Sequence, residues 1–272
     1  MEINMTKIAV VTTFHDQGLR QYGQRMINTF FKNWPADVTL HLYPESCNPA
    51  ISKHENVTLQ RLEEIPELIA FKQQWKDVPK ANGDVSGDPV RSRRKDAGKG
   101  FKWDAVRFAH KVYAIFHCAK NTDADVLFWM DADTVCHSPI TKEQIEKFCP
   151  LTQDLGYLGR EGKYTECGLY SLNLRSPAVR KFLDKFQSVY DNAEEGIFTM
   201  AEWHDSFVFD VVRKSMNLVE NNWSANIIKG EGHPLINSEW GAYLDHLKGD
   251  RKSMGRSHLK DLKITRSESY WQ

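Results

Sequence analysis

The chain has 272 residues, of which 41% are apolar and 26% charged, a composition that excludes a mainly disordered chain. This length suits one large α/β domain or two small ones. The 36 Lys and Arg residues balance the 36 Asp and Glu residues, which argues against a general nucleic-acid coat, and no apolar run approaches the roughly 18 residues that a membrane span needs.

The first predicted elements are a strand, a helix and a second strand. Residues 7–13 are apolar and β-branched, residues 17–33 have near-helical apolar spacing ended by Pro35, and residues 38–43 form another strand-like run. A strand, a helix and a strand in so short a stretch predict a βαβ unit and a parallel sheet, with ligands at the carboxyl ends of the strands. Because no basic stretch with a long apolar core precedes this unit, we expect no signal peptide.

Residues 76–102 break this pattern. They are rich in Gly, Asp, Lys and Arg, lack periodicity and include Arg91, Arg93 and Arg94. We expect a long, mobile basic loop. A solvated charged excursion and a lid that contacts an acceptor are both open interpretations.

The remaining chain alternates helices and strands before an irregular end. The predicted elements are a helix over 101–120, a strand over 125–130, strands at 156–159 and 168–173, helices at 176–191 and 204–216, and an aromatic-rich extension over 221–272. We find no internal repeat. The expected architecture is therefore one α/β domain with a mostly parallel sheet flanked by helices, whose C-terminal extension closes a ligand site.

Five dispersed cysteines form no C-x-x-C motif: Cys47, Cys118, Cys136, Cys149 and Cys167. This usage favours buried thiols and a reducing, cytoplasmic setting. In the extension, Trp240, Tyr270 and Trp271 either pack or rest peripherally on a bilayer, and the sequence does not reveal the oligomeric state.

Two carboxylates follow the apolar strand that ends at Met130. Asp131 and Asp133 would project into the crevice at the sheet edge. Mg²⁺ and Mn²⁺ prefer oxygen ligands, and two carboxylates are costly to desolvate without a cation or donors, so we expect a metal site. The similar pair at 123–125 precedes the strand and is expected to be a turn.

This motif resembles those of two enzyme classes. Nucleotide-sugar glycosyltransferases of the GT-A fold have an Asp-x-Asp after an apolar strand, and haloacid-dehalogenase-like phosphatases have Asp-x-Asp-x-Thr/Val, which residues 131–135 also fit. The phosphatase motif normally opens its domain and is joined by acidic ligands late in the chain. Gly249 and Asp250 begin such a pattern but lack its second Asp. The transferase pattern fits better, and a phosphatase with Asp131 as nucleophile stays the alternative.

A segment near the C-terminus favours the transferase. His246, Gly249 and Lys252 have the form His-x-x-Gly-x-x-Lys, which resembles a segment of the family 8 retaining glycosyltransferases, the family of glycogenin and bacterial lipooligosaccharide galactosyltransferases. The resemblance implies that His246 completes the metal site of Asp131 and Asp133, while Gly249 and Lys252 hold the diphosphate. Imidazole suits Mn²⁺, and an ammonium group suits phosphate.

Other segments resemble the same family. Residues 166–173 resemble a strand that lines the sugar pocket, with Glu166 where an Asn is usual, and residues 203–209 resemble a segment whose Asp, here Asp205, faces the donor sugar. Glu166 and Asp205 are thereby implied to position sugar hydroxyls, although Asp205 as a helix N-cap is an alternative. The resemblance also implies donor contacts by residues of the first strand, the metal motif and the helix before it: Val11, Thr12, Thr13, Ala132, Arg107 and Lys111.

The sequence thus predicts a metal-dependent glycosyltransferase. The resemblance implies Mn²⁺ or Mg²⁺, a UDP-sugar donor and retention of configuration. Because no convincing nucleophile is present, a front-side mechanism is expected, in which the leaving phosphate helps to deprotonate the acceptor. The acceptor (glycan, lipid, protein or nucleic acid) is open. So are a catalytically silent nucleotide-sugar binder and a transferase that grips nucleic acid through the basic stretch from Arg91 to Lys102.

Overall fold

A computed structural model describes residues 6–51, 56–225 and 233–272. Residues 1–5, on which the expectation of no signal peptide partly rests, lie outside this range, as does 226–232 of the C-terminal extension.

The centre of the fold is a seven-stranded sheet with the strand order β3-β2-β1-β4-β7-β6-β8. Neighbouring strands of this sheet run parallel to each other, except that β7 runs antiparallel to both β4 and β6. The expected mostly parallel sheet is therefore confirmed, as is the N-terminal βαβ unit, since β1 and β2 pair in parallel. The strands, including a separate β5–β9 pair, are β1 Ile8–His15, β2 Thr39–Glu45, β3 Val57–Leu59, β4 Val126–Met130, β5 Thr134–Cys136, β6 Leu155–Leu158, β7 Glu166–Asn173, β8 Glu220–Asn222 and β9 Leu244–His246.

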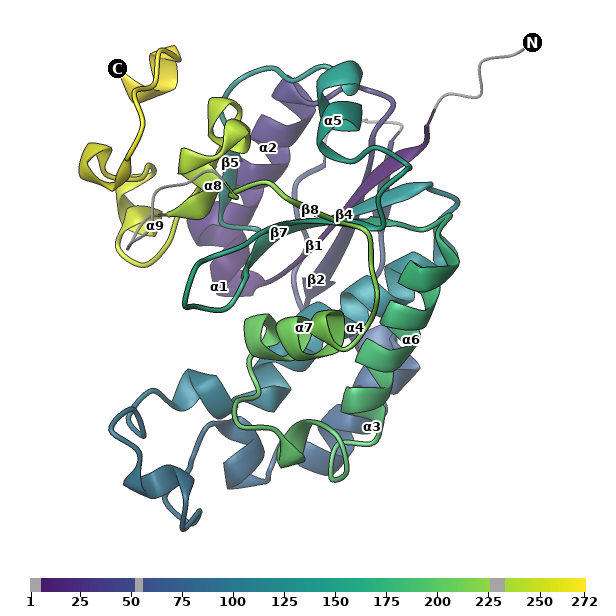
Figure 1. Ribbon diagram of the computed structural model, residues 1–272, viewed down its shortest axis with the longest axis vertical. Helices are drawn as coiled ribbons and strands as arrows, with labels where there is room; N and C mark the ends of the chain where they lie inside the picture. Colours follow the sequence, from purple (N-terminus) through teal and green to yellow (C-terminus); the bar gives the residue numbers. More distant parts are fainter. Residues whose placement is uncertain (1–5, 52–55, 226–232) are drawn as a thin grey trace.

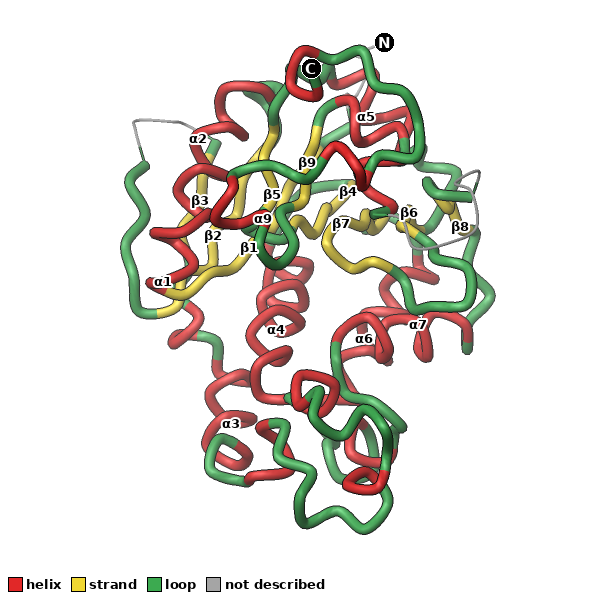
Figure 2. The backbone as a smooth tube through the Cα atoms, turned by 90° about the vertical axis from the view of Figure 1, so that its left-hand side faces the viewer, coloured by secondary structure: helices red, strands yellow, loops and turns green. Residues whose placement is uncertain are grey.

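Helices cover both faces of this sheet (Figure 1). Figure 2 shows α4 and α6 below the layer of strands. The α-helices are α1 Asp16–Gly18, α2 Gln24–Asn33, α3 Pro66–Trp75, α4 Ala105–Asn121, α5 Lys142–Phe148, α6 Pro177–Asp191, α7 Asp205–Lys214, α8 Pro234–Asn237 and α9 Arg251–Met254. The predicted long helices are present, and the predicted first helix is divided by a π-helical turn at Leu19–Gly23.

Side chains of β4 alternate between two buried cores. Leu127 and Trp129 pack with α3, α4, α6 and α7, whereas Val126, Phe128 and Met130 pack with α2, α5 and α8. Since both faces of the strand are covered, its sequence is a continuous apolar run rather than an alternating one. The polar side chains that follow Met130 therefore emerge at the edge of a fully buried strand.

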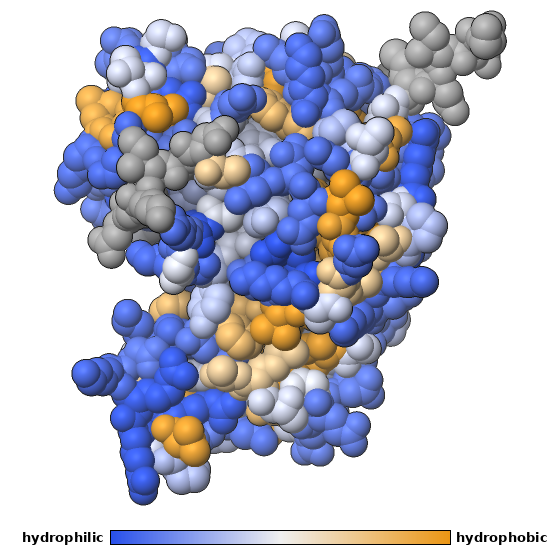
Figure 3. Space-filling model, in the orientation of Figure 1, coloured by the Kyte–Doolittle hydropathy of each residue, from blue (hydrophilic) through white to orange (hydrophobic). Residues whose placement is uncertain are grey.

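The segment predicted as a mobile basic loop contains short 3₁₀ turns at Pro79–Asn82, Arg91–Arg93 and Gly100–Trp103. Three of its cations, Arg91, Arg94 and Lys102, have acidic partners. The Glu202 carboxylate lies 2.8 Å from the Lys102 ammonium and 3.1 Å from the Arg94 guanidinium. These contacts fasten the segment to the chain just before α7, in the lower helical part of the molecule. Figure 3 shows the surface indented at its left edge, between this part and the part that contains the sheet.

The C-terminal extension is less irregular than expected, because it contributes β8, α8, β9 and α9. Its aromatic side chains pack within the protein: Trp240 and Trp271 are buried, and the Tyr270 ring stacks on His137 at 4.0 Å between centroids. The five cysteines are free and buried, as expected. Within the described residues, no helix combines the length and the apolarity needed to cross a membrane.

Candidate functional site

The chain topology brings His246 to the Asp-x-Asp motif. The motif ends β4, and β5 follows it directly and pairs antiparallel with β9, so that Thr134 lies opposite His246. The Leu247 amide then donates to the Asp133 carbonyl at 2.8 Å. Residues more than a hundred positions apart are thus held side by side by a backbone ladder rather than by side-chain contacts alone.

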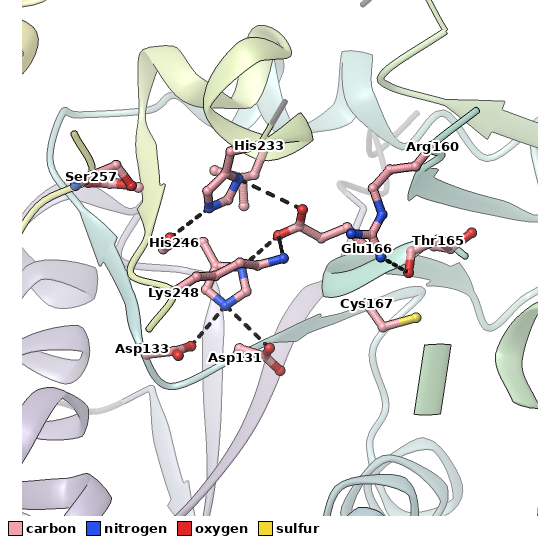
Figure 4. A network of polar contacts seen from close by, with 12 residues as sticks. Asp131, Asp133, Arg160, Thr165, Glu166, Cys167, His233, His246, Lys248 and Ser257 are labelled. Atoms are coloured by element: carbon pink, nitrogen blue, oxygen red, sulfur yellow. Dashed lines mark hydrogen bonds and ion pairs between the residues drawn. The ribbon is translucent and has the colours of Figure 1, made fainter. Parts of the chain in front are cut away.

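The side chains of Asp131, Asp133 and His246 converge (Figure 4). Nε2 of His246 lies 3.0 Å from a carboxylate oxygen of Asp133 and 3.4 Å from one of Asp131. The three residues offer ligand atoms that all lie within 4.8 Å of one another. Two carboxylates and an imidazole form a donor set that suits Mn²⁺, so the residues fit the metal that the sequence motifs imply.

The other ring nitrogen of His246 contacts Glu166. Nδ1 of His246 lies 2.8 Å from a Glu166 carboxylate oxygen, and the Lys248 ammonium lies 2.6 Å from the same oxygen. Burial opposes the charge on Glu166, but Lys248 and His246 outweigh it and hold the pKa of Glu166 well below its ordinary value. Burial likewise opposes charge on His246, but chiefly Asp133, together with Glu166, raises the pKa of His246 to about 9.

Lys111 on α4 joins the metal motif to α7. Its ammonium lies 3.0 Å from Asp131, 2.6 Å from Asp205 and 2.5 Å from the Cys167 carbonyl oxygen. Burial opposes the charge on both residues, yet Asp131 and Asp205 together raise the pKa of Lys111, and Lys111 holds the pKa of Asp205 below its ordinary value. The N-cap of α7 is His204, not Asp205, so the capping alternative for Asp205 is wrong.

A pocket opens at the carboxyl ends of β1 and β4. Of the eight residues predicted to hold the donor, Thr13, Arg107, Lys111 and Ala132 line this pocket, as do both carboxylates of the metal motif, Asp131 and Asp133, whereas Gly249 and Lys252 are not among its lining residues. The other lining residues are Phe14, His15, Tyr22, Glu45, Leu62, Phe108, His110 and Trp129. Val11 and Thr12 are fully buried in β1 and are not among these lining residues. Because the pocket lies at the carboxyl end of β1, only the last three residues of this strand, Thr13, Phe14 and His15, reach it.

Glu166 and Asp205 are also absent from the residues that line this pocket. Asp205 lies beside it through Lys111, whereas Glu166 lies behind His246 and is 1% exposed. The contacts of Glu166 therefore favour a role in orienting His246 over the expected contact with a sugar hydroxyl.

The predicted diphosphate segment lies next to the carboxylates. The Lys252 ammonium lies 2.9 Å from Asp133 and 4.8 Å from the centre of the Tyr22 ring. Burial opposes its charge, but Asp133 raises the pKa of Lys252. Gly249 has a φ of +60°, in the left-handed region that glycine adopts without strain. This turn directs Lys252 back toward the motif.

Sequence reasoning missed His233 and gave no role to Lys248. The side chains of both residues lie next to the Glu166 carboxylate, which contacts His246. Lys248 stands two residues after His246, a spacing that places side chains on one face of an extended segment and was a usable signal. His233 directly precedes a proline, and no periodicity or motif marks it.

No protein-family model and no curated protein matches the chain. Solved structures similar to it include the bifunctional glycosyltransferase WbbM, the glycosyltransferase GlyE of Streptococcus pneumoniae and the galactosyltransferase LgtC in complex with donor and acceptor sugar analogues. Their identities are 12%, 9% and 11%, with TM-scores of 0.47, 0.42 and 0.44. The matches cover 82%, 80% and 80% of this chain but 40%, 45% and 74% of those chains, so this chain spans less than half of the first two. Likeness at this level of identity concerns the fold alone.

The first prediction concerns the buried Lys111–Asp205 pair. Lys111→Met leaves the Asp205 carboxylate buried without its cation, so we expect the free energy of unfolding at pH 7 to fall by about 3–5 kcal/mol in urea titrations. Adding Asp205→Asn should recover part of this loss, because the amide is neutral. The matched control is Lys120→Met on the same helix, whose half-exposed side chain pairs with Glu67 at 4.0 Å and should change stability by less than about 1 kcal/mol.

The same pair sets a pH dependence. Since the folded-state pKa of Asp205 is depressed, its contribution is present above the ordinary Asp pKa of about 4 and is lost as the pH falls through the lower folded-state value. The stability difference between wild type and Lys111→Met should therefore shrink on acidification below about pH 4. A difference that stays constant down to pH 3 would contradict the pairing.

The second prediction concerns the close approach of β7 to His246. A Cβ at Gly168 would lie 2.4 Å from both Cε1 and Nδ1 of His246, so the ring or the strand must move. We expect Gly168→Ala to lower the free energy of unfolding by about 1–3 kcal/mol in urea titrations. Gly98→Ala is the control, because nothing lies within 4 Å of its Cβ position. Equal stability of the two variants would show that His246 is not seated against Gly168.

Proposed function

We propose that the chain is a metal-dependent, GT-A-like glycosyltransferase that moves a sugar from a nucleoside diphosphate donor, such as a UDP-sugar, to an acceptor. The observation that carries the proposal is the convergence of His246 and Lys252 on Asp133, which lines the pocket together with Asp131. A diphosphate needs a cation and donors of positive charge, and these residues offer a metal-ligand set and an ammonium group together.

In this proposal, Asp131, Asp133 and His246 hold Mn²⁺ or Mg²⁺, which when bound supplies positive charge to the diphosphate. Lys252 exchanges its contact with Asp133 for one with phosphate. Arg107, which also lines the pocket, contributes a second cation near the donor. The nucleoside lies along the end of β1, where Thr13 and His15 line the pocket.

The sugar lies toward Asp205 and Lys111. Lys111 binds both Asp205 and Asp131, so it fixes the sugar side of the site relative to the metal side. A retaining, front-side transfer is consistent with this arrangement, because it needs no carboxylate nucleophile beside the sugar. Besides Asp131 and Asp133, the only carboxylate that lines the described pocket is Glu45, which lies on the side of β2. We also propose that the sheet and the C-terminal extension act as one domain, in which β9 completes the donor site.

The third prediction tests this function by ligand-induced thermal stabilisation. With Mn²⁺ present, UDP or another nucleoside diphosphate should raise the melting temperature, because a ligand that binds only the folded state stabilises it by mass action. Asp133→Ala and His246→Ala should abolish the metal-dependent part of the shift. The matched control is Asp123→Asn, in the other Asp-x-Asp segment, whose 82% exposed side chain pairs only with Lys7 among the ion pairs of the described residues.

Transfer itself is then measured as release of the nucleoside diphosphate from a panel of nucleotide sugars. Binding with no release of the diphosphate would identify the silent binder. An absence of stabilisation by any nucleotide, with or without metal, would overturn the proposed function. Formation of an aspartyl–beryllium fluoride complex on Asp131, which mimics aspartyl phosphate, would replace the transferase with the phosphatase.

A further inference from the structure

The His246 ring separates two groups of potential metal ligands. Nε2 faces Asp131 and Asp133, whereas Nδ1 faces Glu166 and, behind it, His233 (Figure 4). Each group, His246 included, offers ligand atoms that lie within 4.8 Å of one another. The proposed function uses only the first group.

The second group contains two buried atoms with unsatisfied lone pairs. Nε2 of His233 lies 2.7 Å from the carbonyl oxygen of His246, and since a carbonyl only accepts, Nε2 carries the proton. In the neutral ring, Nδ1 of His233 therefore presents a lone pair, 3.8 Å from the second carboxylate oxygen of Glu166. Neither atom has a hydrogen-bond partner among the described residues, and both residues are buried. Two buried acceptors that face each other at this distance leave a place for a cation.

We propose that Glu166, His233 and Nδ1 of His246 form a second cation site, suited to Zn²⁺ or a similar borderline transition metal. Two imidazole nitrogens and one carboxylate favour such an ion, whereas the oxygen-richer group at the Asp-x-Asp motif favours Mn²⁺ or Mg²⁺. The separation of 3.8 Å between Nδ1 of His233 and Glu166 is compatible with two bonds of about 2.1 Å to one ion.

Lys248 also contacts this group. Its ammonium neutralises the Glu166 oxygen that also contacts His246. The Lys248 side chain is 39% exposed, so it can withdraw into solvent when an ion brings a larger positive charge. The site thus already holds a cation at Glu166, and metal binding exchanges one for another.

The two cation sites exclude each other, because a neutral imidazole offers one lone pair. When Nδ1 of His246 binds an ion, Nε2 keeps its proton and donates to Asp133, 3.0 Å away. When Nε2 binds an ion, Nδ1 keeps its proton and donates to Glu166, 2.8 Å away. Both states have the carboxylate–histidine–metal arrangement that orients histidine ligands. This competition rests on the proposed function, but the second site itself does not.

The fourth prediction is tested in the double variant Asp131→Asn, Asp133→Asn, which removes the carboxylates of the first site. The asparagine oxygens can still accept the proton of His246 Nε2. Titration with Co²⁺ should give visible absorption bands of a bound ion, and Zn²⁺ should bleach them. Adding His233→Ala or Glu166→Gln should weaken Co²⁺ binding at least about tenfold, whereas adding His258→Ala, a histidine paired with Asp250, should not.

Co²⁺ bands that are absent from the double variant, or that persist unchanged without His233 and Glu166, would overturn the second site. Circular dichroism checks that each variant is folded. If His233→Ala does not fold, Glu166→Gln decides the test.

Mutual exclusion of the two sites is tested in the wild type. Zn²⁺ should reduce the Mn²⁺-dependent stabilisation by UDP, and this reduction should be smaller in His233→Ala. If Zn²⁺ binds without that reduction, the exclusion is overturned. A lack of UDP stabilisation before Zn²⁺ is added would instead count against the proposed function.

Discussion

The site depends on placing carboxylates in a buried environment and neutralising each with a cation. Asp133, Glu166 and Asp205 are largely removed from water, which would strongly disfavour their charged forms if they stood alone. His246 is shared between the first two, and Lys111 holds the third. Removing Lys111 would leave Asp205 without its paired cation, whereas Asp133 and Glu166 would keep Lys252 and Lys248, respectively, if His246 were removed.

Backbone pairing, not side-chain attraction, sets the position of the shared cation. The β5–β9 ladder fixes His246 beside Asp133, and the absence of a side chain at Gly168 lets β7 approach the ring. Glu166, near the start of β7, then meets the opposite side of the imidazole. The ring, carried by β9, lies between the turn after β4, which carries Asp133, and the start of β7, which carries Glu166, so one histidine can contact a carboxylate on each side.

Much of the fold was predictable from local pattern. The strand before Asp131 has a continuous apolar run because both of its faces are buried, and the N-terminal βαβ unit has clear periodicity. The convergence of Asp131, Asp133 and His246 was reached through a motif resemblance, and the structure brings these residues together.

The rest depended on tertiary contacts that leave no periodic signal. A motif resemblance predicted that Glu166 faces a sugar, but its carboxylate contacts His246, His233 and Lys248, which lie more than sixty residues further along the chain. Residues 76–102 lack periodicity, so the sequence predicted a mobile loop. The ion pair of Lys102 with Glu202, a hundred residues further along the chain, leaves no local signal. His233 has no neighbouring motif, so only the folded chain reveals its place behind His246.

The most direct test of the account is whether His246 binds a divalent metal together with the two aspartates. Pulsed electron paramagnetic resonance of the protein with Mn²⁺ and UDP reports nitrogen nuclei that coordinate the ion. The account predicts modulation from a directly bound imidazole nitrogen in the wild type and its loss in His246→Ala. Mn²⁺ that binds without this nitrogen signal, or that does not bind at all, would contradict it.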